Sequence, residues 1–182
     1  MLFQELLLQR QSVRKYIDKP VEREKLQVLI EAVHMSPSAC NSQPWKLVMV
    51  DDVELKNEVA KATFDKIVLF NKFALEAPVI AVLVMEKAKL IAQIGGNIKN
   101  QEYSYYDIGI AAAHFCLQAT ELGLGTCMIG WFNEKRIQEL LNIPSNRKVA
   151  LVITLGYPPE DYKLRIKIRK SSDEIASFNS YK

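Results

Sequence analysis

The chain has 182 residues, of which 49% are apolar and 25% charged, and its formal net charge at pH 7 is +3. This length and composition are typical of one globular domain with a buried core, which we expect to span residues 1–182. The small, dispersed positive charge argues against nucleic-acid binding, because proteins that bind nucleic acids carry clustered basic faces. It remains compatible with a small anionic ligand.

Cysteines and histidines are few. Cys40, Cys116 and Cys127 form no C-x-x-C pair, and an odd count argues against a disulfide framework. His34 and His114 are far apart in the sequence, so no zinc site is expected. The N-terminus does not match a signal peptide, and no apolar run approaches membrane-spanning length. We therefore expect a protein of the reducing cytoplasm, without a membrane segment.

The first part of the chain is expected to place two helices around one strand. Leu26, Leu29 and Val33 recur at helical spacing. Asp51 precedes Glu54 by three residues, as in a helix cap. The expected elements are a short helix over 2–9, a basic extended segment over 10–19, a helix over 22–35, a loop over 36–44, a strand over 45–50 and a helix from the Asp51 cap toward residue 73.

The second part also alternates strands with helices. The polar stretch 86–104 contains Gly95-Gly96 and is expected to be a mobile flap. The helix over 107–122 is apolar almost all round, so it must be buried on nearly every side, which a subunit interface would achieve. The other expected elements are strands over 79–85 and 149–155, a short strand or loop over 126–131 and a helix capped by Asn133 that ends before Pro144. This alternation indicates an α/β or α+β class with one central sheet.

No side-chain catalytic motif is recognisable. The chain has no G-x-S-x-G elbow, no H-E-x-x-H and no Walker sequence. The segment beginning at Gly123 starts like a dinucleotide fingerprint, but Met128 stands where the third glycine should be, and the segment follows a helix. If the chain is an enzyme, we expect a bound cofactor to carry the reaction.

Cations are concentrated near both ends of the chain. Arg10, Ser12 and Arg14 offer two guanidinium groups and a hydroxyl within five residues, and arginine forks suit phosphate. The stretch 163–169 alternates cations with apolar residues, so in a strand all its cations would share one face. That face is either an anion-binding surface or the solvated side of an edge strand protected by lysines.

Hydroxyls and amides occupy a loop at 36–45, which is held by two prolines and leads directly into a strand. Side chains of Asn and Gln both donate and accept hydrogen bonds, so Asn41 and Gln43 could read the edge of a heterocycle. The alternative is a simple helix-to-strand connection built from turn residues.

Together these segments resemble the nitroreductase family. Arg10, Ser12 and Arg14 match an opening signature close to R-x-S-x-R, and residues 37–45 match one close to P-S-x-x-N-x-Q-P-W. The order is completed by Ala77-Pro78 before an apolar strand, the run 107–130 with its Gly-Leu-Gly turn, Leu155-Gly156-Tyr157-Pro158 and Lys167-x-Arg169. The resemblance covers nearly the whole chain and rests on six motifs in the same order.

The resemblance implies an α+β (mixed α/β) fold of three layers, with a central mixed sheet flanked by helices, in an intertwined homodimer that holds FMN at its interface. It implies an oxidoreductase that passes hydride from NADH or NADPH to a small acceptor such as a nitro compound or a quinone. Arg14 would lie beside the pyrimidine side of the flavin ring and support its reduced form.

The resemblance also assigns the cofactor-binding residues. Arg10, Ser12, Lys167 and Arg169 would hold the phosphate, with Gln11 between them where the family often has a basic residue. Pro37, Ser38, Asn41 and Gln43 would come from the other subunit, Asn71 would hydrogen-bond the ring edge, and Ile129 and Gly130 would line the ring through their backbone.

Two features leave alternatives open. Lys163 and Arg165 are extra cations, so the terminal phosphate ligands could lie two residues earlier than Lys167 and Arg169. The activity has two alternatives as well: a non-catalytic protein that stores or senses FMN, and a flavin-consuming or dehalogenating branch of the same superfamily.

Overall fold

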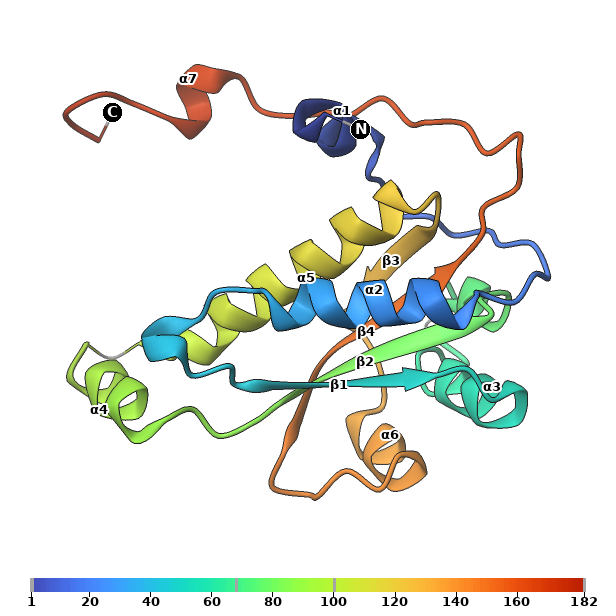
Figure 1. Ribbon diagram of the computed structural model, residues 1–182, viewed down its shortest axis with the longest axis horizontal. Coiled ribbons are helices and arrows are strands. Elements are labelled where there is room, and N and C mark those ends of the chain that lie inside the picture. The colour runs from blue at the N-terminus through green and yellow to red at the C-terminus, as the bar shows by residue number, and fades with distance from the viewer. Residues whose placement is uncertain (1, 68, 100, 182) are drawn as a thin grey trace.

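Three layers build the protein, with a four-stranded sheet between two layers of helices (Figure 1). The computed structural model describes residues 2–67, 69–99 and 101–181. In chain order the elements are α1 (Phe3–Gln9), α2 (Arg23–His34), the 3₁₀ turn η1 (Ala39–Asn41), β1 (Trp45–Val50), α3 (Val53–Lys61), the 3₁₀ turn η2 (Lys72–Leu75), β2 (Val79–Met85), α4 (Leu90–Lys99), α5 (Tyr103–Glu121), β3 (Gly125–Ile129), α6 (Glu134–Leu140), β4 (Lys148–Gly156) and α7 (Ser172–Ile175). The three-layer α+β fold expected from the sequence is confirmed.

The strand order is β1-β2-β4-β3, and each of these pairings is antiparallel. The parallel component of the sheet within the described residues is one isolated bridge, which joins Ser12 to Thr126 of β3. All seven residues of β2 are buried, which explains why its sequence is an unbroken apolar run. The bridge matters most for function, because it attaches the basic N-terminal segment to the sheet edge.

The alternation of side chains along the strands divides the core in two. Ile80, Val82 and Val84 of β2 face the layer that contains α3, η2 and α6. Val79 and Leu83 lie in the other core, under α2 and α5. Both cores are therefore built on one central strand.

Helix α5 begins at Tyr103, four residues before its expected start at 107, and crosses the sheet diagonally (Figure 1). Phe115 and Ala119 are fully buried against the sheet. The opposite side is not covered in the single chain: Tyr106 is 59% exposed and Ile110 37% exposed. The expectation that this helix is buried nearly all round is therefore met on one side only.

Helix α3 corrects two expectations. Its cap is Asp52, whose side chain accepts from the backbone N–H of Leu55 at 2.8 Å, whereas Asp51 pairs with Arg23. The helix ends at Lys61, well before residue 73. The Ala62 carbonyl accepts instead from the backbone N–H of Asn133 at 2.7 Å, so the chain after α3 contacts the start of α6 in the same layer.

The segment 86–104, expected to be a mobile flap, is not a continuous loop, because it contains α4. The glycine pair lies inside this helix. A Cβ on Gly96 would lie 2.5 Å from the backbone oxygen of Gln101, so the helix can approach the following loop closely only with glycine there. None of the described helices is long and apolar enough to cross a membrane.

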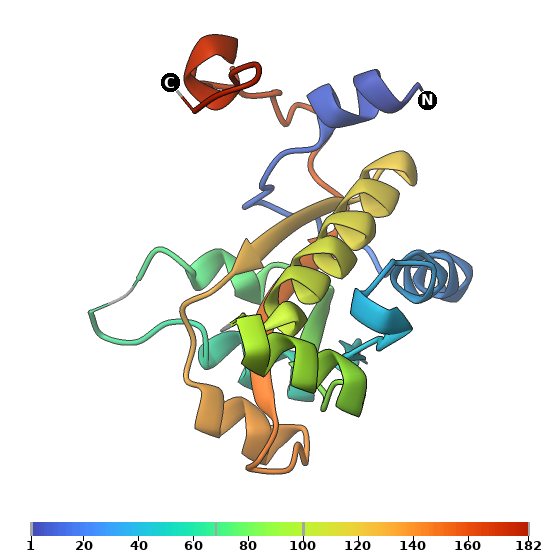
Figure 2. The ribbon, with the colours of Figure 1, turned by 90° about the vertical axis from the view of Figure 1, so that its left-hand side faces the viewer.

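Residues 163–170 do not form an edge strand in the described chain, so that interpretation is wrong. The segment runs back past α1 outside the three layers, and α1 and α7 lie on the same side of the molecule (Figures 1 and 2). Its apolar side chains are uncovered: Ile166 is 93% exposed and Ile168 88% exposed.

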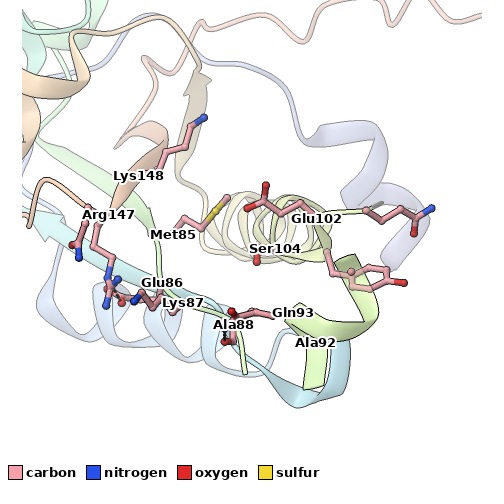
Figure 3. A pocket seen from close by; sticks show the side chains of 14 residues that line it. Met85, Glu86, Lys87, Ala88, Ala92, Gln93, Glu102, Ser104, Arg147 and Lys148 are labelled. Atoms are coloured by element: carbon pink, nitrogen blue, oxygen red, sulfur yellow. Dashed lines mark hydrogen bonds and ion pairs between the residues drawn. The ribbon is translucent and has the colours of Figure 1, made fainter. Parts of the chain in front are cut away.

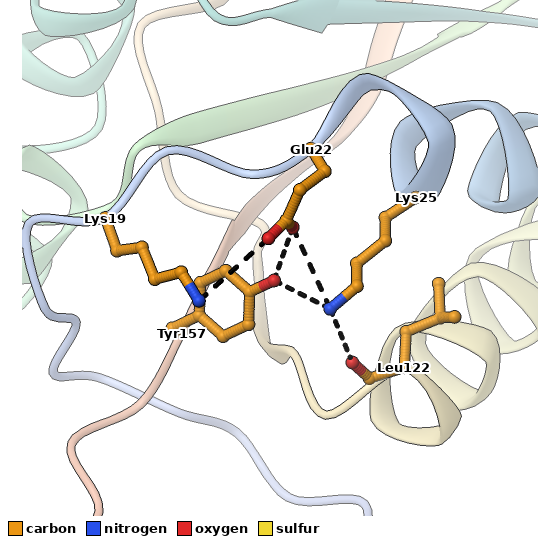
Figure 4. Close-up of polar contacts among 5 residues, drawn as sticks. All are labelled: Lys19, Glu22, Lys25, Leu122 and Tyr157. Carbon is orange, nitrogen blue, oxygen red and sulfur yellow. Dashed lines mark hydrogen bonds and ion pairs between the residues drawn. The ribbon is translucent and has the colours of Figure 1, made fainter.

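A polar cluster around Tyr157 holds the N-terminal segment to α2, α5 and the end of β4 (Figure 4). Tyr157 Oη accepts from Lys25 Nζ at 2.7 Å and donates to the Glu22 carboxylate. Lys25 Nζ also donates to the Leu122 carbonyl, and Lys19 lies over the Tyr157 ring, 4.1 Å from its centroid. The hydrogen bond from Tyr157 lowers the pKa of Glu22, and the contact with Tyr157 raises the pKa of Lys25.

Tyr157→Phe should therefore destabilise the fold at neutral pH more than in acid. A lowered carboxyl pKa contributes stability above its ordinary value, and this is lost as pH falls through the lowered value. The raised pKa of Lys25 contributes at both pH values. Urea unfolding at pH 7 and at about pH 3 gives the free energy of unfolding at each pH. The difference between these two values should be smaller for Tyr157→Phe than for the parent. Tyr181→Phe, at a fully exposed tyrosine, is the control. Identical pH dependence in all three proteins would contradict this role.

Candidate functional site

The two basic ends of the chain lie side by side at one edge of the sheet. Residues 10–14 run along β3, where the backbone N–H of Val13 donates to the Thr126 carbonyl at 2.8 Å. Lys167 reaches the same segment, and its Nζ donates to the Arg10 carbonyl at 2.7 Å. The structure therefore brings together cations from opposite ends of the sequence.

Positive charge accumulates at this edge. The pKa of Lys167 is lowered mainly by desolvation and to a smaller extent by the charges of Arg10 and Arg169. Among the residues that the structure describes, no ion pair joins Arg10, Lys167 or Arg169 to a carboxylate. We call Arg10, Lys167 and Arg169 the cation cluster. Its chemistry is that of an anion site, because each member repels the others until a negative charge lies between them.

The buried groups beneath this edge provide no counter-charge. Burial raises the pKa of the Cys116 thiol to about 11, against the opposing effects of a hydrogen bond with Thr126 and of the charge of Arg10. Burial also raises the pKa of Cys127, which lies near Arg14 and Arg165. Both thiols are therefore neutral at physiological pH, and the positive charges above them remain uncompensated.

Arg14 and the end of β3 form the inner part of the same site. The Arg14 guanidinium lies over the Phe73 ring, 5.9 Å from its centroid. Ile129 is buried at the end of β3, and Gly130 follows it as an exposed residue. Asn71 is buried, and its Nδ2 donates to the carbonyls of Thr63 at 3.0 Å and Trp131 at 3.4 Å. Asn71 thus fixes the backbone that follows Gly130.

The loop with Pro37, Ser38, Asn41 and Gln43 is firmly built. Ser38 Oγ accepts from the Gln43 backbone N–H at 2.9 Å, and Gln43 Nε2 donates to Asn41 Oδ1 at 2.9 Å. Cys40, Asn41 and Gln43 all have positive φ, near 50°, which costs energy for residues other than glycine. Such strain is typical of backbone held in one shape for a purpose, and here it keeps the polar side chains on a short exposed turn.

This loop lies far from the cation cluster within one chain. The Ala39 backbone N–H donates to Asp107 in the first turns of α5, whereas the basic segment 10–14 lies beside Thr126, beyond the other end of α5. At about 1.5 Å per residue, the helix separates these places by roughly 20 Å. Both views show the loop and the basic segment at opposite ends of α5 (Figures 1 and 2).

The structure therefore divides the sequence-predicted site into two groups. One edge of the chain carries Arg10, Gln11, Ser12, Arg14, Asn71, Ile129, Gly130, Lys167 and Arg169. The other end of α5 carries Pro37, Ser38, Asn41 and Gln43. Within the described residues no hydrogen bond or ion pair joins the two groups. A single complete site would therefore need one group from each of two copies of the chain, or a rearrangement of one chain.

Two cavities lie near these groups. One of about 680 Å³ is enclosed by α4, the start of α5 and the loop before β4, and the Arg147–Glu86 ion pair of 2.7 Å lies in its wall (Figure 3). The other, of about 390 Å³, is lined by Trp131 and Phe132 directly after Gly130.

Sequence reasoning also missed Tyr162. Its hydroxyl accepts from the Arg14 backbone N–H at 3.0 Å and from Arg165 at 3.0 Å. A tyrosine directly before a cationic stretch has no distinctive signal, because the contact joins residues 148 positions apart.

Comparison with known proteins decides which family the chain belongs to. The family model described as "Nitroreductase family" matches residues 7–157, most of the chain. The chain belongs to the nitroreductase family. The match includes the basic segment, the strained loop and the Tyr157 cluster, whereas Lys167 and Arg169 lie beyond it. Family membership makes the chain an oxidoreductase.

Nitroreductase relatives and structures cover most of the chain. An oxygen-insensitive NADPH nitroreductase of Helicobacter acinonychis is 28% identical over 84% of this chain and 85% of its own length. The crystal structure of a nitroreductase family protein from Clostridium novyi has 32% identity and a TM-score of 0.77, covering 88% of this chain and 87% of that one. The NADPH:FMN oxidoreductase of Vibrio harveyi, solved with NAD+, has 25% identity and a TM-score of 0.79, covering 98% and 77%. Iodotyrosine deiodinase 1 of Rattus norvegicus is 24% identical over 95% of this chain and 68% of its own length.

Proposed function

We propose that this nitroreductase binds FMN and passes hydride from NADH or NADPH to a small acceptor such as a nitro compound or a quinone. The observation that carries the proposal is the cation cluster, in which Arg10, Lys167 and Arg169 have no described carboxylate partner. FMN has the one feature this cluster demands, a terminal phosphate.

The donor set fits a phosphate monoester. Such a group carries between one and two negative charges at neutral pH and several acceptor oxygens. Two guanidinium groups and an ammonium match it in charge, and guanidinium forks match it in shape. The proposed ligands are Arg10, Ser12, Lys167 and Arg169, with Gln11 in the same segment.

The residues beyond the cluster suit a flavin ring. When bound, FMN would accept hydride from the nicotinamide and deliver it to the acceptor. Arg14 would hold positive charge beside the pyrimidine side of the ring, where negative charge is then stabilised. Asn71 would meet the ring edge, and the backbone of Ile129 and Gly130 would line one side of the ring. Each of these residues lies on the same edge of the chain as the cation cluster.

We further propose that the sites are shared between the subunits of an intertwined homodimer. The strained loop with Pro37, Ser38, Asn41 and Gln43 would reach the site of the partner, because it lies at the far end of α5 from the cluster in its own chain. Large apolar side chains left exposed support this: they lie on α1, on the open side of α5 and on the tail, at Leu2, Phe3, Leu7, Leu8, Tyr106, Ile110, Leu164, Ile166, Ile168 and Phe178.

The alternation at 163–169 has a function in such a dimer. Lys167 and Arg169 would serve the phosphate of their own chain, while Leu164, Ile166 and Ile168 would pack on the partner. The three free cysteines suit a protein that folds as one domain in the reducing cytoplasm.

Mixed dimers test the shared site directly. One chain carries Lys167→Ala with Arg169→Ala, and the other carries Asn41→Asp, which tolerates positive φ but removes an amide donor. Each variant alone should hold little FMN. A heterodimer purified through two different tags should regain one FMN, because one of its two sites then contains no substitution.

A heterodimer as empty as both parent variants would show that each site lies within one chain. A monomer by light scattering that retains FMN would also contradict the shared site.

The acceptor class has a second candidate. The rat iodotyrosine deiodinase relative covers 95% of this chain, which favours testing the dehalogenating branch. Sustained oxidation of NADPH or NADH with a quinone supports the reductase. Release of iodide from an iodinated tyrosine without quinone turnover supports the dehalogenating branch. Absence of both reactions supports storage or sensing of FMN.

A further inference from the structure

We infer that Tyr162 and Arg165 form a clamp that fixes the flavin-binding segment 10–14 in position, and that Arg165 acts through this clamp and is not a phosphate ligand. This inference rests on the proposed FMN site and assigns new positioning residues to it. The clamp consists of Tyr162, Arg165 and the side chain of Gln11.

The clamp holds the backbone of the residues whose side chains are proposed to face FMN. Tyr162 Oη accepts from the Arg14 backbone N–H at 3.0 Å. Arg165 donates through its guanidinium to the Ser12 carbonyl at 2.6 Å and to Tyr162 Oη at 3.0 Å. The clamp therefore holds Ser12 and Arg14 through their backbone groups and not through their side chains.

Gln11 completes the clamp in a way that a basic residue could not. Its Oε1 accepts from the Arg165 backbone N–H at 3.1 Å, and its Nε2 donates to the Lys163 carbonyl at 3.4 Å. The amide thus pairs with the tail as another strand would, by one donor and one acceptor. Lysine or arginine can only donate, so either would leave the Arg165 N–H without this partner.

The clamp adds to the other backbone contacts of the segment. Lys167 Nζ donates to the Arg10 carbonyl at 2.7 Å, and Tyr16 Oη donates to the Val13 carbonyl at 2.9 Å. The segment belongs to no named strand and joins the sheet through the isolated bridge at Ser12 and the bond from Val13 to Thr126. The Val13 side chain is buried and anchors the middle of the segment. Residues on either side of Val13 would otherwise move with an exposed backbone, and a binding group gains precision when its support is rigid.

The same geometry separates the roles of the four terminal cations. The Arg165 guanidinium is engaged by two protein oxygens, on Ser12 and Tyr162. The Arg169 guanidinium donates to the neighbouring Ile168 carbonyl at 2.7 Å and lies near Lys167, whose own charge is close to that of Arg10. Lys167 and Arg169 therefore remain the phosphate ligands, and the displacement by two residues left open by the sequence is not needed.

Hydrogen–deuterium exchange on the FMN-free protein tests the clamp without relying on activity. Backbone amides of residues 10–14 should exchange faster in Tyr162→Phe and in Arg165→Gln than in the parent. Tyr105→Phe is the matched control, because it removes a hydroxyl that accepts from Lys148 at 3.1 Å, away from the clamp. Unchanged exchange in both clamp variants would overturn the inference.

Flavin measurements on the loaded protein supply the second part of the test. Tyr162→Phe should raise the FMN dissociation constant by about threefold to tenfold, the usual effect of one net hydrogen bond. Because Arg14 would be held less firmly, the flavin midpoint potential should also fall. Arg165→Lys should show the same lower FMN affinity and lower midpoint potential as Arg165→Gln, since an ammonium lacks the planar fork that joins two oxygens.

The possible failures are distinguishable. A parent protein that takes up no FMN refutes the proposed function. A parent that binds FMN, with clamp variants equal to it in affinity and potential, refutes the clamp alone. A variant that does not fold is replaced in both measurements by Gln11→Lys, which removes the acceptor for Arg165 and leaves Tyr162 intact.

Discussion

Replacing both Lys167 and Arg169 by alanine should release FMN, with a dissociation constant raised by about a hundredfold or more. Each charged hydrogen bond to the phosphate contributes about 1.5–3 kcal/mol, and every 1.4 kcal/mol is a factor of ten in affinity. The cluster that these residues form with Arg10 has no described carboxylate partner, so no described carboxylate competes with the phosphate for these cations. Fluorescence titration of the apoprotein with FMN measures the change.

Lys163→Ala is the matched control for this double variant. It removes one cation from the same tail and keeps the backbone carbonyl of residue 163, which accepts from Gln11 Nε2 at 3.4 Å. Its FMN affinity should stay within a factor of about three of the parent, as expected for an exposed charge outside the site. A double variant that binds FMN as tightly as the control would show that the phosphate lies elsewhere.

Phe115→Ala should lower the free energy of unfolding by about 3–5 kcal/mol, the typical cost of removing a fully buried aromatic ring. Phe115 is completely buried and belongs to the core that joins α2 and α5 to the sheet. The loss combines lost burial with a cavity that rigid neighbours such as Leu29 and Ile153 cannot fill. Urea unfolding followed by circular dichroism gives the value.

Val53→Ala controls for a general effect of truncating an apolar side chain. Val53 is 68% exposed at the first position of α3, so its loss should cost well under about 1 kcal/mol. Equal losses in both variants would mean that α5 is not packed on the sheet as described.

The spacing of apolar residues correctly predicted the helix and the strands that bury one face or both faces in the core. The helix over 22–35 and the strands over 45–50, 79–85 and 149–155 are confirmed, because their apolar spacing matches the faces that they bury. The Asn133 cap is confirmed as well, with its side chain accepting from the Arg136 backbone N–H at 3.0 Å.

Elements decided by distant contacts were predicted less well. Helix α3 stops where the Ala62 carbonyl meets the Asn133 backbone, more than seventy positions along the chain, and no local signal marks that contact. Glycines at 95 and 96 indicated a loop, but they allow α4 to pack closely on the residues that follow it. The alternation at 163–169 predicted a strand, although its apolar face has nothing to pack on within one chain.

The site shows the same division. The family motifs identified the residue types that surround the cation cluster. The alternation at 163–169 alone left open whether its cations bind an anion or form the solvated side of an edge strand. The assembly of Arg10 with Lys167, and the clamp through Tyr162, depend on the fold that brings the two ends together. Sequence patterns report the chemistry of each segment, and the sheet edge beside β3 determines which segments meet.

The most direct test of the account is a visible absorption spectrum of the purified protein, recorded before and after anaerobic addition of NADPH or NADH. The account predicts a flavin spectrum that bleaches on addition. A colourless protein that also fails to take up added FMN would contradict the central claim that the cation cluster holds the phosphate of a flavin.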